Sequence, residues 1–132
     1  MNKFFIFLLY VWQLPQVIIG SIVYLYYKHN VKDTYNRGIV KYYFVKDFPG
    51  GISLFPFILI SYRSMYNINS INHEYGHYIQ SLYLGPLYIF IIGIPSATWA
   101  FLYGRIIKET HNGYYKFYTE KWADKLGGVI RG

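Results

Sequence analysis

The chain has 132 residues, enough for one domain at most, and 54% of them are hydrophobic while only 14% are charged. This apolar excess favours a membrane protein, and the lack of cysteine excludes disulfides and thiolate metal sites. The net charge is +7, but the basic residues flank apolar segments instead of forming one stripe. That distribution fits the anionic headgroups of a lipid bilayer, so we expect a bilayer partner and no nucleic acid.

The first apolar segment, residues 4–27, carries no charge and is long enough to span the hydrocarbon core of a bilayer. Gln13 and Gln16 interrupt it, and Pro15 is expected to kink the helix. A cleavable signal peptide is the alternative, but its apolar region would be too long and no small-x-small cleavage site follows. We therefore predict a retained transmembrane anchor at 4–27.

A polar segment follows, and within it residues 39–45 have the β-branched and aromatic content typical of a strand. Residues 48–51, with the sequence F-P-G-G, indicate a turn, and residues 52–60 read as a second strand or a shallow membrane segment. Pro56 removes a backbone donor, which places that strand at a sheet edge. The predicted hairpin, residues 38–62, would either pair with an extended peptide or simply pack on the bilayer or the helices.

The sequence H-E-Y-G-H at residues 73–77 is an H-E-x-x-H motif. Residues four apart share one face of a helix, so His73 and His77 can both direct an imidazole at one metal ion. Glu74 then lies where its carboxylate can take a proton from a metal-bound water. Zn²⁺ suits imidazole ligands and an open position for water. The alternative, two surface histidines beside an exposed Glu74, is disfavoured by the apolar flanking sequence.

The segment 70–107 is predicted to contain the metal helix and a returning apolar helix. The metal helix should run from about Ser70 to Leu84, where Gly85-Pro86 ends it. The returning helix, from Leu87 to about 107, belongs to an uncharged run that starts at Tyr78. If the metal helix enters the bilayer and its partner returns, the basic segments share one side, which the positive-inside rule makes cytoplasmic.

A third protein ligand is expected from residues 119–124, with the sequence T-E-K-W-A-D. Glu120 and Asp124 are four apart, so a helix at 114–128 presents both carboxylates on one face. One of them can bind zinc while the other accepts the free ring N–H of a ligating histidine. The alternative is an ordinary amphipathic helix with an acidic pair.

The motifs H-E-Y-G-H and E-K-W-A-D together resemble the H-E-x-x-H … E-x-x-A-D signature of the membrane gluzincin peptidases typified by HtpX and the CAAX prenyl proteases. The resemblance covers the two motifs, within residues 70–128. It implies that His73, His77 and Glu120 bind zinc, that Glu74 is the general base, and that Asp124 supports a ligand histidine.

We therefore expect a mainly α integral membrane protein with about three membrane-embedded helices, a small β-hairpin and a C-terminal motif helix. Its expected activity is zinc-dependent hydrolysis of a peptide or membrane-protein substrate at the cytoplasmic face of the inner membrane. A monomer and a homo-oligomer both remain open. The alternatives are a site-2-protease-like intramembrane peptidase, with Asp124 as third ligand, and a non-enzymatic membrane protein whose metal staples helices. Five residues are candidate donors to a developing oxyanion, although structural or interfacial roles explain each more simply: Arg105, His111, Tyr114, Tyr118 and Arg131.

Overall fold

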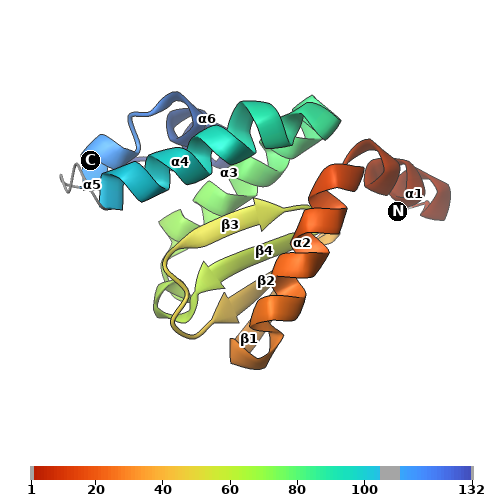
Figure 1. Cartoon of the computed structure of the whole chain (residues 1–132), viewed down its shortest axis with the longest axis horizontal. Coiled ribbons are helices and arrows are strands. Elements are labelled where there is room, and N and C mark those ends of the chain that lie inside the picture. The colour runs from red at the N-terminus through yellow and green to blue at the C-terminus, as the bar shows by residue number, and fades with distance from the viewer. Residues whose placement is uncertain (1, 105–110, 132) are drawn as a thin grey trace.

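A four-stranded sheet lies at the centre of the computed structural model, which describes residues 2–104 and 111–131 (Figure 1). Its strands are β1 (Val31–Arg37), β2 (Val40–Val45), β3 (Gly51–Leu54) and β4 (Phe57–Ser61). They lie in the order β1-β2-β4-β3, so β1 and β3 are the edge strands. β2 and β4 are parallel, whereas β1 pairs with β2, and β3 with β4, in antiparallel register.

Helices cover both faces of this sheet, and Figure 1 shows α2 and α3 on opposite sides of it. The α-helices of the described ranges are α1 (Lys3–Trp12), α2 (Leu14–Tyr27), α3 (Ile68–Leu84), α4 (Ile94–Leu102), α5 (His111–Tyr114) and α6 (Tyr118–Gly127). Short 3₁₀ segments are η1 (Lys28–Asn30), η2 (Tyr62–Ser64) and η3 (Gly85–Leu87), and η4 (Ile89–Gly93) is π-helical.

The alternation of side chains along β2 explains how one strand serves two layers. Tyr42 and Phe44 point to the face that α3 covers, where they join a buried cluster with Tyr78. Tyr43 points to the other face, where its ring contacts that of Tyr24 on α2, with centroids 4.7 Å apart. Because both faces are covered, the strand reads as nearly continuous apolar sequence.

The structure corrects the predicted fold class. The domain is mixed α/β and not mainly α. β1, in the polar segment, was not predicted, and residues 52–60, predicted as one edge strand, form the edge strand β3 and the central strand β4 around a turn at Phe55-Pro56. The predicted pairing of 39–45 with 52–60 as one hairpin is also wrong, since β2 runs parallel to β4. β1 escaped prediction because it is a mostly exposed edge strand with the polar sequence V-K-D-T-Y-N-R.

The predicted membrane-embedded helices are corrected as well. Residues 4–27 do not form one helix, because the chain bends by 85° between α1 and α2, at Gln13. Among residues 2–104 and 111–131, no single helix is both long and apolar enough to cross a bilayer; the bent pair meets those criteria only when its two helices are taken together. The predicted returning helix at 87–107 is divided into η3, η4 and α4, and its last residues lie outside the described ranges.

Candidate metal centre

The helix α3 places the two histidines of the H-E-x-x-H motif on one buried face. The side chain of Asn67 caps its N-terminus by accepting hydrogen bonds from the backbone N–H groups of Asn69 and Ser70. His73 and His77 are 4% and 5% exposed, and their ring centroids are 4.8 Å apart. The helix spacing therefore brings both imidazoles to one point, as expected for residues four apart.

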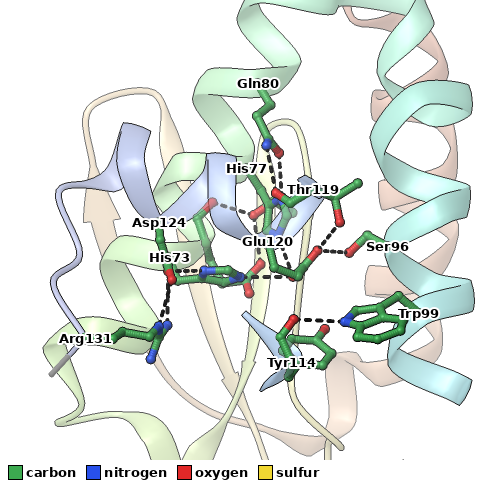
Figure 2. Close-up of polar contacts among 12 residues, drawn as sticks. His73, His77, Gln80, Ser96, Trp99, Tyr114, Thr119, Glu120, Asp124 and Arg131 are labelled. Carbon is green, nitrogen blue, oxygen red and sulfur yellow. Dashed lines mark hydrogen bonds and ion pairs between the residues drawn. The ribbon is translucent and has the colours of Figure 1, made fainter. Parts of the chain in front are cut away.

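Close packing of α6 against α3 supplies the third residue. A Cβ atom at Gly76 would lie 1.8 Å from the carbonyl oxygen of Ala123, and one at Gly127 would lie 2.0 Å from that of Asn72. Only glycine permits this approach of the two backbones. It brings Glu120, on the first turn of α6, against the two histidines (Figure 2).

Three ligand atoms converge in this buried space. Oε1 of Glu120 lies 3.1 Å from Nε2 of His73 and 3.2 Å from Nε2 of His77. One nitrogen or oxygen from each of the three residues lies within 4.8 Å of the others, and all three side chains are buried. Two imidazole nitrogens and a carboxylate oxygen form a donor set that can hold a metal ion.

The far nitrogen of each imidazole has an acceptor of its own. Nδ1 of His73 donates to Oδ1 of Asp124 over 2.7 Å, and Nδ1 of His77 donates to Oε1 of Gln80 over 2.7 Å. A carboxylate and an amide oxygen can only accept, so both Nδ1 atoms carry the proton and both Nε2 atoms are directed at Glu120. Gln80 in turn donates to the backbone oxygen of Thr119 over 2.9 Å, which links α3 to α6.

The second carboxylate oxygen of Glu120 is held away from the histidines. Its Oε2 accepts from Oγ of Ser96 over 2.7 Å and from Oγ1 of Thr119 over 2.6 Å. Figure 2 shows Ser96 reaching this oxygen from α4. Oε1 is thereby left for the two histidines and for any cation between them.

The charges at the centre favour positive charge between the three residues, either as one metal cation or as protons on the histidines. Burial lowers the pKa of His73, but hydrogen bonds to Asp124 and Glu120 outweigh it and raise that pKa to about 9. Burial lowers the pKa of His77 too, and its contacts with Glu120 raise the net value. Burial raises the pKa of Glu120, yet the two histidines hold it well below its usual range. Protons therefore compete with a metal ion for these imidazoles.

Glu74 lies beside the histidines and against the edge strand β3. Oγ of Ser53 lies 2.7 Å from the backbone oxygen of Glu74 and 3.1 Å from its Oε1, so the Ser53 hydroxyl can donate its hydrogen bond to either oxygen. A Cβ atom at Gly51 would lie 2.6 Å from Oε2 of Glu74, which explains why this position has no side chain. The charge of Glu74 contributes to the raised pKa of both histidines, as expected for a nearby carboxylate.

Asp124 is held in place by the C-terminal segment. Nε of Arg131 donates to its Oδ2 over 2.7 Å, and a second guanidinium nitrogen donates to Oδ1 over 3.1 Å. The same guanidinium stacks over the ring of Tyr115, 3.3 Å from its centroid, and that ring contacts His73. Arg131, one of the five candidate oxyanion donors, is thus the partner of Asp124, which is the simpler, structural role expected from the sequence.

The other candidate oxyanion donors are placed differently. Tyr114 packs on Trp99, and its backbone oxygen accepts a hydrogen bond from Nε1 of Trp99 over 2.9 Å. Burial, followed by the charges of Glu120 and Glu74, raises the pKa of the Tyr114 phenol far above its ordinary value, so it remains a donor. Tyr118 donates instead to the backbone oxygen of Ile91. Arg105 and the side chain of His111 lie outside the described residues.

Several contributors were missed from the sequence. Gln80 follows His77 by three residues, so helix spacing alone placed it on the metal face and could have indicated its role. Ser53, Gly51 and Ser96 reach the centre only through tertiary packing of β3 and α4, and no local pattern marks them.

Comparison with known proteins adds no family to this geometry, because the chain matches no protein-family model, no curated protein and no solved structure. The resemblance to the gluzincin peptidases therefore rests on residues 73–77 and 120–124 alone.

Proposed function

We propose that this protein is a zinc-dependent metallopeptidase. The observation that carries the proposal is the convergence of Nε2 of His73, Nε2 of His77 and Oε1 of Glu120 beside the carboxylate of Glu74. Three protein ligands with a fourth position open to water are typical of catalytic zinc sites, whereas structural sites have four protein ligands. Asp124 contacts Nδ1 of His73, which supports an orienting role for it in preference to that of a ligand.

Zinc is compatible with the donor set, since two imidazoles and one carboxylate hold the metal in catalytic zinc sites. In a tetrahedral site with bonds of about 2.0–2.1 Å, neighbouring ligand atoms are about 3.3 Å apart. The Glu120 oxygen is 3.1 and 3.2 Å from the two histidine nitrogens, which is close to that spacing. When bound, zinc lowers the pKa of a coordinated water to about 7 and polarises a peptide carbonyl.

The chain supplies the remaining groups for peptide hydrolysis. The carboxylate of Glu74 takes a proton from the attacking water and returns it to the leaving amine, while Ser53 holds it in place. The phenol of Tyr114, beside Glu120, donates to the oxygen that becomes negative in the transition state. Asp124 and Gln80 keep both imidazoles in the tautomer that leaves Nε2 free.

The edge strand β3 offers a binding surface for an extended peptide. Ser61 donates its backbone N–H to the carbonyl of Gly50, so alternation along the antiparallel pair turns the backbone groups of Gly51 and Ser53 away from β4. Tyr88 donates its hydroxyl to the carbonyl of Ser53 over 3.0 Å. A substrate strand can therefore pair beside Glu74 at Gly51, and Tyr88 limits how far that pairing extends.

Metal content and turnover together test the proposal. The purified protein should contain about one zinc per chain, and Glu120→Ala and His77→Ala should each lose it. Glu74→Gln should keep its zinc and lose cleavage of an unstructured test protein such as casein. Absence of stoichiometric metal in the wild type would refute the zinc site, and undiminished cleavage by Glu74→Gln would refute the assigned base.

A further inference from the structure

The N-terminal helices carry apolar side chains that the rest of the described chain, residues 31–104 and 111–131, leaves exposed. α1 has no buried residue, although it consists of K-F-F-I-F-L-L-Y-V-W. Phe4, Phe7 and Val11 follow helical spacing along one of its sides, and each is between 53% and 67% exposed. Ile22 and Leu25 on α2 are exposed to a similar extent. Exposed apolar side chains grouped in this way mark a site where a protein or a membrane binds.

The charges around this surface select its partner. Residues 2–30 contain Lys3, Lys28 and His29 but no acidic residue, and all three are exposed. The whole chain has a net charge of +7. A second copy of the chain would bring like charges together at such a surface, whereas anionic lipid headgroups would neutralise them. The exposed ring of Trp12 at the end of α1 also suits the interface between headgroups and acyl chains.

We propose that α1, together with the exposed side of α2, binds the surface of an anionic lipid bilayer and inserts its apolar side chains into one leaflet. α1 has 10 residues, so it is about 15 Å long, half the thickness of the hydrocarbon core. The 85° bend after Trp12 allows α1 to lie in the interface while α2 packs on the sheet. This is the arrangement of an interfacial helix, which lies on a membrane without crossing it.

The structure also fixes the distance between this surface and the metal centre. Nε1 of Trp12 donates to the backbone oxygen of Leu82 over 2.8 Å, and Nε2 of Gln16 donates to that of Gly85 over 2.8 Å. The N-terminal helices are thus docked at the C-terminal end of α3, five to eight residues or about 8–12 Å beyond His77 along the helix. If the proposed peptidase function holds, its substrates include polypeptide segments next to the bilayer.

Vesicle flotation tests the lipid interaction directly. The purified protein is transferred from detergent to vesicles of pure phosphatidylcholine, or of phosphatidylcholine with about one third phosphatidylglycerol. We expect the protein to float with both and at least tenfold more strongly with the anionic vesicles, an excess that high salt removes. Replacing Phe4, Phe7 and Val11 together by Ser should lower the partition coefficient at least tenfold.

A matched control variant removes a similar number of exposed apolar side chains elsewhere. Tyr66, Ile68 and Ile130 are between 63% and 91% exposed, and the first two lie at the opposite end of α3. Their joint replacement by Ser should leave flotation unchanged. Equal losses in both triple variants, or no flotation of the wild type, would overturn the proposal. So would a wild-type dimer that becomes monomeric in the α1 variant and ignores lipid, because a second copy would then cover this surface.

The depth of insertion provides the last test, and cleavage activity does not enter it. Fluorescence of Trp12, taken as the difference between the wild type and Trp12→Phe, should be quenched more by lipids brominated near the headgroup end of the acyl chain than by lipids brominated near its tail. Stronger quenching from the tail end would contradict an interfacial position. Because flotation and quenching are measured without a substrate, they separate failure of this proposal from failure of the peptidase assignment.

Discussion

The carboxylate of Asp124 lies 2.7 Å from Nδ1 of His73, on the side of the imidazole opposite to the nitrogen that faces Glu120. The contact fixes the ring by its proton-bearing atom, and two hydrogen bonds from Arg131 fix the carboxylate itself. Asp124 and Glu120, one helical turn apart on α6, thus act on opposite nitrogens of the same histidine. Their removal should have different consequences for metal binding.

Zinc affinity separates the two acidic residues of α6. We expect Glu120→Ala, which removes a ligand, to abolish stoichiometric zinc binding. Asp124→Ala should weaken zinc binding by roughly 10- to 100-fold, the usual effect of losing a group that orients a ligand. Titration against a fluorescent zinc chelator measures both, with the exposed Asp33→Ala as a control that should bind zinc normally. Equal losses in the two variants would contradict the division of roles.

Gly51 and Gly50 form a matched pair for testing the position of Glu74. A Cβ atom at Gly51 would lie 2.6 Å from Oε2 of Glu74, whereas one at Gly50 would have no atom within 4 Å. Gly51→Ala should therefore displace the carboxylate and lower the cleavage rate at least tenfold, with zinc content unchanged. Gly50→Ala should behave as the wild type. Normal cleavage by Gly51→Ala would show that Glu74 does not need its present position.

Gly76 tests the packing that brings α6 to α3. A methyl group there would lie 1.8 Å from the carbonyl of Ala123, so the two backbones would have to separate. Overpacking of this kind costs about 3 kcal/mol, and the separation also moves Glu120 away from the histidines. Gly76→Ala should lower both the free energy of unfolding and the zinc affinity. Gly93→Ala, whose added Cβ meets only ordinary contacts at 3.7 Å and beyond, is the control.

The role of the Tyr114 hydroxyl can be tested without disturbing its ring. Tyr114→Phe keeps the packing on Trp99 and removes only the donor beside Glu120. If the phenol stabilises the transition state, kcat should fall by about 10²-fold while KM and zinc content stay near the wild-type values. Tyr118→Phe, whose hydroxyl contacts Ile91 instead, is the matched control. An unchanged kcat would exclude the catalytic role of Tyr114.

Helix spacing predicted the centre's local relations because they depend only on the sequence. His73 and His77 are four residues apart, as are Glu120 and Asp124, and the structure brings the two pairs together. Which of the two carboxylates meets Nε2 depends on how α6 crosses α3, and that crossing is fixed by contacts at Gly76. No local pattern predicts such a contact.

The fold was predicted less well, for two physical reasons. An uncharged segment at 4–27 has the same composition whether it forms one straight helix or two bent ones; the bend depends on Gln13 and Gln16, which hydrogen-bond to Ser81 on α3. An apolar run such as 52–60 is equally ambiguous, because strands covered on both faces lose the alternation that marks a strand.

The pKa of His73 gives a prediction for the metal-free protein. Its folded-state value is about 9, above the ordinary 6.5, so the folded chain holds this proton more tightly than the unfolded chain does. The resulting stabilisation, about 3 kcal/mol at most, is complete below pH 6.5 and is lost as the pH rises through about 9.

Urea unfolding with a chelator present should therefore give a lower free energy of unfolding at pH 9.5 than at pH 6. His73→Gln should reduce this dependence, with the raised pKa of His77 accounting for what remains, and His29→Gln, at an exposed position, should leave it unchanged. Zinc binding should follow the opposite course and strengthen across the same interval, because only the deprotonated Nε2 can bind the metal. A free energy of unfolding that rises from pH 6 to 9.5 would contradict the tight proton binding inferred for His73.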